Sequence, residues 1–303
     1  MMAEKKVVPL AVPDIGDDEI EEIKKVMGTG FLTEGATTKE FEQMVAEYLG
    51  VKHAIAVTSC TTGLHAVLHC LDIKGQEVIV PDYTYPATAE AVVLAGGIPV
   101  LADVDLESMN MTSEILEESY NEKMTVFSPV SWAGVPLEKE IYQKAKKLDL
   151  KMLEDAACSL GAKINEDYVG KIADYSCFSF HPRKVITTGE GGMITTDNDE
   201  MFEKCYSFKH FGVKGTSFET IGTNYKLSNV LSAIGVIQMK KIENIVQTRI
   251  QKAKIYEELL SKIDNIKPAY VGENTRQTFQ SYTCYGEKEE YRDKIRKALS
   301  DEN

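Results

Sequence analysis

Short apolar runs alternate with longer helical patterns along most of this chain, and this alternation limits the folds open to it. The predicted strands are 53–57, 77–80, 99–102, 125–129, 151–153, 175–180 and 193–196. The predicted helices are 17–27, 38–49, 61–71, 86–94, 138–148 and 228–262, with Thr38 as the expected cap of the second. This order predicts an α/β protein with a mostly parallel sheet covered by helices on both faces.

Three loops that follow predicted strands carry polar or aromatic residues where ligands of such a sheet gather. Residues 58–63 are small and hydroxylated and open a helix, so their N–H groups can hold a phosphate, although a plain capping turn is the simpler explanation. Residues 81–86 place a tyrosine ring at the mouth of the sheet, where packing or a turn is its usual role. Residues 154–158 place an acid at a strand end, with a helix cap as the alternative.

A fourth loop carries a lysine between two predicted strands. Lys184 follows Pro182, which fixes the approach of the chain, and precedes Gly189, Gly191 and Gly192, which let backbone approach a bound group. Its apolar neighbours predict a partly desolvated site. Desolvation lowers the pKa of an ammonium group and frees the amine to act as a nucleophile, as Schiff-base chemistry requires. A solvated surface position is the usual alternative for a lysine.

The four loops gain meaning when they are taken together. Pyridoxal phosphate (PLP) needs a lysine amine, a carboxylate opposite its pyridine nitrogen, an aromatic ring over its face and a nest for its phosphate. The four loops offer one of each, so the sequence predicts PLP as the cofactor.

Six segments then carry a family resemblance in their order along the chain, from about Val8 to Tyr282. They are GFLTEG, FEQMVAEYLGVKHAIAVTSCTTGLHAVL, EVIVPDYTYPAT, EDAACSLGA, SFHPRKVITTGEGG and GTNYKLSNVLSAIGVIQM. They resemble the DegT/DnrJ/EryC1/StrS family of PLP-dependent nucleotide-sugar aminotransferases. The resemblance implies the type I aminotransferase fold, with a large cofactor-binding domain of mixed, mostly parallel sheet in residues 1–227. Residues 228–303 would form a long connecting helix and a small α+β domain, truncated because family members continue with further strands and helices.

The resemblance also implies an activity. Lys184 would form the Schiff base and shuttle the proton, Asp155 would pair with the pyridinium nitrogen, and Tyr85 would stack on the ring. The reaction would move an amino group from glutamate or glutamine to a nucleotide-linked keto-sugar, for polysaccharide or secondary-metabolite synthesis.

Further cofactor contacts follow from the same resemblance. The backbone of Cys60 and Thr61 and the hydroxyl of Ser179 match the phosphate contacts. Cys158 stands where glutamine or histidine commonly contacts the ring hydroxyl, and a thiol is a weaker hydrogen-bond partner. Asn224 matches an asparagine that reaches the phosphate of the neighbouring subunit, which implies a homodimer with shared active sites.

The sequence departs from the family pattern at several of these places. Cys60 replaces a common glycine, Ser131 begins a Ser-Trp-Ala-Gly segment in place of the usual His-x-x-Gly, and Lys226 replaces a common arginine. We expect these changes to tune substrate choice. Trp132, the single tryptophan, is a candidate lining residue of the sugar pocket, with packing as the commoner role.

Three other functions stay open on the sequence alone. A PLP-dependent sugar dehydratase would carry histidine in place of the lysine, so Lys184 argues against it. A non-catalytic homologue, such as a sensor or an assembly subunit, is motivated by the expected truncation. A nicotinamide-binding Rossmann enzyme has a similar sheet pattern, but no Gly-x-Gly-x-x-Gly follows the first predicted strand.

The composition limits which binding partners and which cellular compartment we expect. A formal charge of −13 argues against nucleic acid, because binding phosphate backbones needs a basic face. The six cysteines show no paired spacing, so we expect neither a metal site nor disulfides, and we expect His53, His65 and His69 to be structural. The first residues lack the apolar core of a signal peptide and no run of ~18 apolar residues follows, so we expect a cytoplasmic protein that does not enter membranes.

Overall fold

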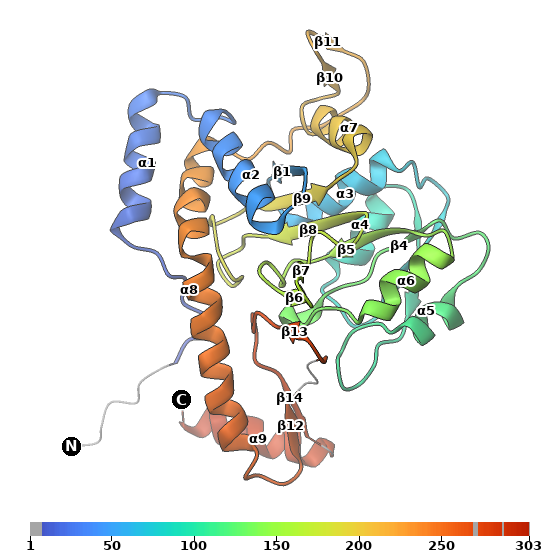
Figure 1. The fold of residues 1–303 in the computed structure, drawn as a ribbon, viewed down its shortest axis with the longest axis vertical. Coiled ribbons are helices and arrows are strands. Elements are labelled where there is room, and N and C mark those ends of the chain that lie inside the picture. The colour runs from blue at the N-terminus through green and yellow to red at the C-terminus, as the bar shows by residue number, and fades with distance from the viewer. Residues whose placement is uncertain (1–7, 269–271, 287, 303) are drawn as a thin grey trace.

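A seven-stranded sheet forms the centre of the computed structural model, which describes residues 8–268, 272–286 and 288–302 (Figure 1). Its strand order is β1-β9-β8-β5-β4-β2-β3. The strands are β1 (His53–Val57), β2 (Glu77–Pro81), β3 (Ile98–Ala102), β4 (Val126–Phe127), β5 (Lys151–Asp155), β8 (Tyr175–Ser179) and β9 (Gly192–Thr196). β9 pairs antiparallel with both neighbours, whereas β8, β5, β4, β2 and β3 pair in parallel. The predicted mostly parallel, mixed sheet is therefore confirmed.

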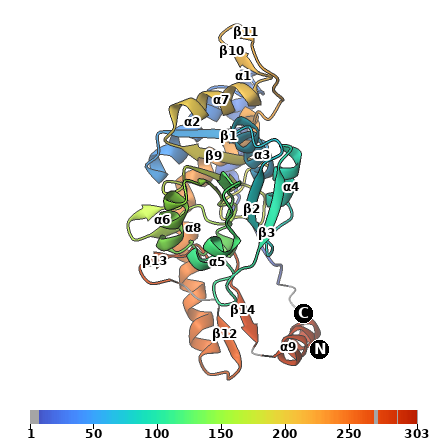
Figure 2. The same ribbon diagram turned by 90° about the vertical axis from the view of Figure 1, so that its right-hand side faces the viewer.

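Helices cover both faces of this sheet. One face carries α3 (Cys60–Cys70), α4 (Ala87–Leu94) and α7 (Asp199–Lys209); the other carries α2 (Ala36–Leu49), α5 (Ser113–Ser119), α6 (Lys139–Lys147) and α8 (Asn229–Leu260). In Figure 2, α3 and α4 lie to the right of the sheet and α2, α6 and α8 to the left. Alternate strand residues face opposite helices, because successive side chains of a strand point to opposite faces.

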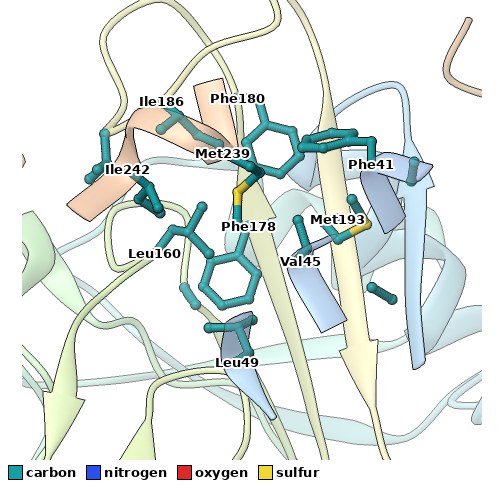
Figure 3. Packing of buried hydrophobic residues seen from close by; sticks show 14 of the residues in the cluster. Phe41, Val45, Leu49, Leu160, Phe178, Phe180, Ile186, Met193, Met239 and Ile242 are labelled. Carbon is teal, nitrogen blue, oxygen red and sulfur yellow. The ribbon is translucent and has the colours of Figure 1, made fainter. Parts of the chain in front are cut away.

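The core between α2, α8 and the sheet is aromatic (Figure 3). The ring of Phe180 lies against Phe41 of α2, with ring centres 5.1 Å apart, and the ring of Phe178 lies beside Leu160 and Leu49. All three rings are fully buried. Burying such side chains stabilises the fold by roughly 1.5–3 kcal/mol each. This packing fixes the C-terminal end of β8, from which the lysine loop departs.

Thr38 is not the helix cap that the sequence predicted. α2 begins two residues earlier, at Ala36, with Gly35 as its N-cap. Thr38 is fully buried, and its hydroxyl contacts Asn229 and Ser232 of α8. The helix is longer because this tertiary partner satisfies the threonine hydroxyl that a cap would otherwise use.

One other prediction differs at its edges, and several short elements were not predicted. β4 is shorter than the predicted strand 125–129, because Pro129 has no N–H to donate. The sequence did not predict α7 or the short strands β6 (Lys163–Ile164), β7 (Asp167–Tyr168), β10 (Val213–Lys214) and β11 (Ser217–Phe218).

The helix α8 runs along one side of the whole structure and leads to the C-terminal elements (Figure 1). Ser228 is its N-cap and accepts a hydrogen bond from the Leu231 N–H. Beyond it lie β12 (Ile266–Pro268), β14 (Cys284–Gly286) and α9 (Glu289–Glu302). β13 (Thr275–Arg276) pairs with β6 in a separate three-stranded sheet. The predicted division between residues 227 and 228 falls at the start of α8 and stays a prediction.

α1 (Asp17–Thr29) packs along the N-terminal part of α8, where Lys241 forms an ion pair with the buried Glu19. In the described ranges, no helix combines the length and the apolar character that crossing a membrane requires.

Candidate active site

Asp155 ends β5 at the carboxyl edge of the sheet and is almost fully buried, with 5% of its surface exposed. Its Oδ2 accepts a hydrogen bond from the Thr88 hydroxyl at 2.8 Å. Its Oδ1 accepts from the Ala157 N–H at 3.1 Å and faces the Cys60 thiol at 3.6 Å. Helices α3 and α4 thus hold the carboxylate from one face of the sheet.

Lys184 lies in the loop between β8 and β9. The loop is closed at its base, because the Phe180 N–H donates to the Gly191 carbonyl at 2.9 Å. The Lys184 ammonium donates to the Cys158 sulfur at 3.2 Å, and among the described residues it has no other hydrogen-bond acceptor. The charge of Asp155 acts on the Lys184 amine, so the amine and the carboxylate lie at the same site.

The pKa of Lys184 corrects one prediction. Burial lowers it, as expected, but the hydrogen bond to Cys158 and the charge of Asp155 oppose burial and raise the pKa above its ordinary value. The predicted lowered pKa is therefore wrong for this structure, because an amine that faces a carboxylate is favoured in its charged form.

The turn between β1 and α3 is the predicted phosphate nest. Ser59 is the N-cap of α3 and accepts a hydrogen bond from the Thr62 N–H at 3.1 Å. The N–H groups of Cys60 and Thr61, in the first turn, have no acceptor within the helix. The Cys60 thiol points away from them, toward Asp155 and the carbonyl of Cys177.

Ser179 approaches this turn across the sheet. It pairs with Gly192 at the start of β9. A Cβ at Gly192 would lie 2.4 Å from the carbonyl carbon of Ser59 and 2.5 Å from the nitrogen of Cys60. β9 therefore reaches the turn only because residue 192 has no side chain. Ser179, opposite Gly192 in the antiparallel pair, lies on the same face of the sheet as this approach.

The structure does not bring every predicted site residue into contact with Lys184, Asp155 or the β1–α3 turn. Tyr85 lies in the loop after β2, but 77% of its surface is exposed. Tyr83 of the same loop faces Trp132, with ring centres 5.4 Å apart. Asn224 bridges to His210, and its neighbour Tyr225 accepts a hydrogen bond from the Thr58 N–H at 3.1 Å. Asn224 thus lies near the β1–α3 turn without a side-chain hydrogen bond among the described residues.

The thiols of the site stay protonated at neutral pH. Burial and the nearby Asp155 carboxylate raise the pKa of Cys60 well above its ordinary value. Burial raises the pKa of Cys158, although the Lys184 ammonium partly opposes it. Both cysteines are therefore neutral side chains here.

Sequence analysis missed a C-terminal segment that touches three loops of the site, and we call residues 278–281 the strap. The Thr278 hydroxyl donates to the Cys158 carbonyl at 3.0 Å and its N–H to the Gly134 carbonyl at 3.2 Å. The Gln280 amide donates to the Arg183 carbonyl, beside Lys184, at 2.9 Å. A Cβ at Gly134, where φ is +88°, would lie 2.1 Å from the Thr278 hydroxyl oxygen. No local spacing could reveal contacts of such sequence separation.

Sequence analysis also missed the setting of Glu154, which precedes Asp155 on β5 and points to the opposite face of the sheet. Its carboxyl group accepts hydrogen bonds from the Ser131 hydroxyl and, at 3.1 Å, from the Tyr142 hydroxyl of α6. Burial raises the pKa of Glu154 to about 7, and the nearby Asp155 charge adds to this. Among the described residues, the hydrogen-bond partners of this acid are two hydroxyl groups.

The described residues fit PLP. A carboxylate offers about four acceptor positions, and the partners of Asp155 occupy three, which leaves one for a pyridinium N–H. A lysine amine faces the same site, and the free N–H groups of a helix N-terminus suit a phosphate.

A lysine and a buried carboxylate at the carboxyl edge of such a sheet define a PLP-dependent aminotransferase of fold type I. The sequence matches the DegT/DnrJ/EryC1/StrS aminotransferase family over residues 13–303, and the chain belongs to this family.

Known proteins agree with this assignment. GDP-perosamine synthase of Caulobacter vibrioides is 33% identical over 289 residues, which cover 93% of this chain and 78% of the relative. The aminotransferase PseC of Helicobacter pylori, involved in the biosynthesis of pseudoaminic acid, superposes with a TM-score of 0.90 at 27% identity, over 96% of this chain and 80% of PseC. The PLP form of the sugar aminotransferase Spr1654 of Streptococcus pneumoniae gives 0.91 at 26% identity, over 98% and 83%.

The comparisons confirm the predicted family, fold and cofactor. The chain is a PLP-dependent sugar aminotransferase, and this function is favoured over the dehydratase, the non-catalytic homologue and the nicotinamide-dependent enzyme.

Proposed function

We propose that this enzyme transfers an amino group from glutamate or glutamine to the keto group of a nucleotide-linked sugar. The observation that carries the proposal is the Lys184 amine facing the site that holds the buried Asp155 carboxylate. The relative named GDP-perosamine synthase supports the substrate class, because its name gives a nucleotide-linked amino sugar as its product.

Two residues would carry the chemistry. PLP, when bound, supplies an electron sink for the bond changes at the amino-bearing carbon. Lys184 binds the cofactor covalently and then, as a free amine, moves a proton at its Nζ atom between the donor and the cofactor. Asp155 keeps the pyridine nitrogen protonated by offering it a buried negative charge.

Other residues would hold and orient the cofactor. The N–H groups of Cys60 and Thr61 and the hydroxyl of Ser179 bind its phosphate, and Cys158 faces its ring hydroxyl. Tyr85 covers the ring. Since most of the Tyr85 surface is exposed in this structure, we expect its ring to become buried when the cofactor and substrate bind.

The proposal includes a homodimer with shared active sites. The hairpin of β10 and β11 projects from the body of the protein (Figure 1). Phe218 and Ile221, on and just after it, are 76% and 86% exposed. Apolar side chains on a projecting hairpin suit contact with a second copy, and Asn224, which follows them, would reach the partner's phosphate site. The cytoplasm remains the proposed compartment, since all six cysteines are free thiols.

Borohydride trapping tests the cofactor site. The purified chain is incubated with PLP, its visible absorbance is recorded, and borohydride reduction is followed by peptide mapping. We expect a visible band and a pyridoxyl label on Lys184. Lys184→Ala should lose both, whereas the control Lys171→Ala, which changes an exposed lysine paired with Asp167, should keep both. A folded protein labelled elsewhere, or not at all, would refute the assignment.

Subunit mixing tests the shared site. Lys184→Ala and Asn224→Ala are each expected to be nearly inactive. Co-refolding equal amounts should restore activity in about a quarter of the sites, because each mixed dimer has one site with both native residues. No recovery, with mixed dimers present, would show that Asn224 acts within its own subunit. A donor screen with glutamate and glutamine, followed by keto-sugar nucleotides, then defines the substrates.

A further inference from the structure

We propose that Thr88 is a positioning residue of the transfer reaction, and that its hydroxyl fixes both the Asp155 carboxylate and the loop that carries Tyr85. This inference rests on the proposed function, in which Asp155 faces the pyridine nitrogen. Neither the motifs nor the family match assigns a role to Thr88.

The contact between Thr88 and Asp155 is direct and buried. Only 1% of the Thr88 surface is exposed, and its hydroxyl lies 2.8 Å from Oδ2 of Asp155. The other carboxylate oxygen is held by the Ala157 N–H and the weak Cys60 thiol. Among the described residues, Thr88 is therefore the one donor to Oδ2, and it fixes the rotation of the carboxylate about its last bond.

The direction of the hydrogen bonds follows from chemistry. An ionised carboxylate only accepts, so Thr88 must donate its hydroxyl proton to Asp155. The Thr84 hydroxyl, 3.1 Å from that of Thr88, must then be the donor in that pair. The result is a relay from Thr84 through Thr88 to Asp155, in which each bond polarises the next. The relay therefore fixes the direction in which the Thr88 hydroxyl points, with its proton toward Oδ2 of Asp155.

The same residue anchors the loop after β2. Thr88 lies in the first turn of α4, and its N–H donates to the carbonyl of Tyr85 at 3.3 Å. Its hydroxyl also lies 3.5 Å from that carbonyl, a longer contact than the one to Asp155. Tyr85 and Asp155 come from different strand ends, and Thr88 links them directly. Thr88 therefore holds both Tyr85, expected above the cofactor ring, and Asp155, expected at the pyridine nitrogen.

Thr88→Val tests this role, because valine keeps the shape and removes the hydroxyl. We expect PLP to remain bound and Lys184 to remain the labelled residue. The donor half-reaction should slow by about tenfold to a hundredfold, the range known for groups that orient a functional ligand through a hydrogen bond. The KM for the donor should change little, because Thr88 does not contact it, and the band of bound PLP should shift in its pH dependence.

Thr88→Ser and Thr84→Val complete the series. Serine restores the hydroxyl and should restore most of the rate and the native spectrum, which a purely structural loss of the threonine methyl would not allow. Thr84→Val removes only the outer donor of the relay and should have a smaller effect in the same direction.

The outcomes separate this inference from the proposed function. If Lys184 is labelled and Thr88→Val matches the native protein in half-reaction rate and spectrum, the role of Thr88 is refuted and the function stands. If all three variants lose activity only in proportion to their loss of folded protein, Thr88 is structural. If the native chain shows no label on Lys184, the proposed function itself fails.

Discussion

Glu154 and Asp155 are adjacent, buried carboxyl groups at the end of one strand, yet they occupy very different surroundings. Asp155 points toward α3 and α4, where it accepts three hydrogen bonds and faces a lysine amine. Glu154 points toward α6, where two hydroxyl groups contact it and its pKa rises to about 7. The pair teaches that the face of the sheet, and not depth of burial, decides which acid is held ready for chemistry.

The largest expected effect comes from removing the negative charge of Asp155. Asp155→Asn keeps the shape but removes the negative charge opposite the pyridine nitrogen, so we expect PLP to bind while the donor half-reaction slows by about 10²- to 10⁴-fold. Glu154→Gln is the matched control, because it makes the same chemical change one residue away on the other face. Stopped-flow absorbance with the donor measures both. Equal losses in the two variants would contradict the comparison.

The next effect concerns Glu154 and stability. Its pKa is about 7 in the folded chain and ordinarily 4.5, so between these values the folded state holds a proton that the unfolded state has released. The stabilising contribution is therefore complete below pH 4.5 and is lost as pH rises to 7. At about 1.4 kcal/mol per pKa unit, the free energy of unfolding should fall by about 3 kcal/mol from this group.

Glu154→Gln isolates that contribution, because glutamine does not titrate. Urea unfolding of both proteins between pH 5 and 8 gives the difference between their free energies of unfolding, in which the titration of other groups cancels. The variant should gain relative stability as pH rises. A difference that does not change with pH would show that Glu154 does not titrate in this range.

The smallest expected effect comes from the hydroxyl partners of Glu154. Tyr142→Phe removes one hydrogen bond from the carboxyl group, at a cost of about 1 kcal/mol in the free energy of unfolding. The half-reaction rate should stay close to the native value, because Tyr142 lies on the face away from Lys184. A large loss of rate with little loss of stability would mean that the two faces are coupled.

The sequence predicted the seven strands of the large sheet and most helices, because the alternation of apolar runs is a local signal. The predicted strand 151–153 stopped before the two acids, whereas β5 runs on to Asp155 and places residues 154 and 155 on opposite faces. The strand pattern does not show which face carries the lysine, and the choice of Asp155 came from the family resemblance. The pKa of Lys184 was predicted in the wrong direction, since a sequence indicates burial but does not show that the amine contacts Cys158 and lies near the charge of Asp155.

The missed features depend on contacts between distant parts of the chain. Lys209 is fully buried because two acids pair with it. Glu34, in the loop between α1 and α2, lies 3.0 Å away, and Glu42 of α2 lies 3.2 Å away. The role proposed for Thr88 depends on the fold, which places α4 beside the end of β5. Neither contact leaves a spacing pattern in the sequence.

The strap has a consequence for how the enzyme is made in the cell. Domains begin to fold from the N-terminus while the ribosome is still adding residues. A nascent chain that ends before residue 278 already contains Lys184, Asp155 and the phosphate turn. It still lacks the groups that tie the loops at Gly134, Cys158 and Arg183 together. We therefore expect stable cofactor uptake to await synthesis of the strap, after Lys184, Asp155 and the phosphate turn have been made.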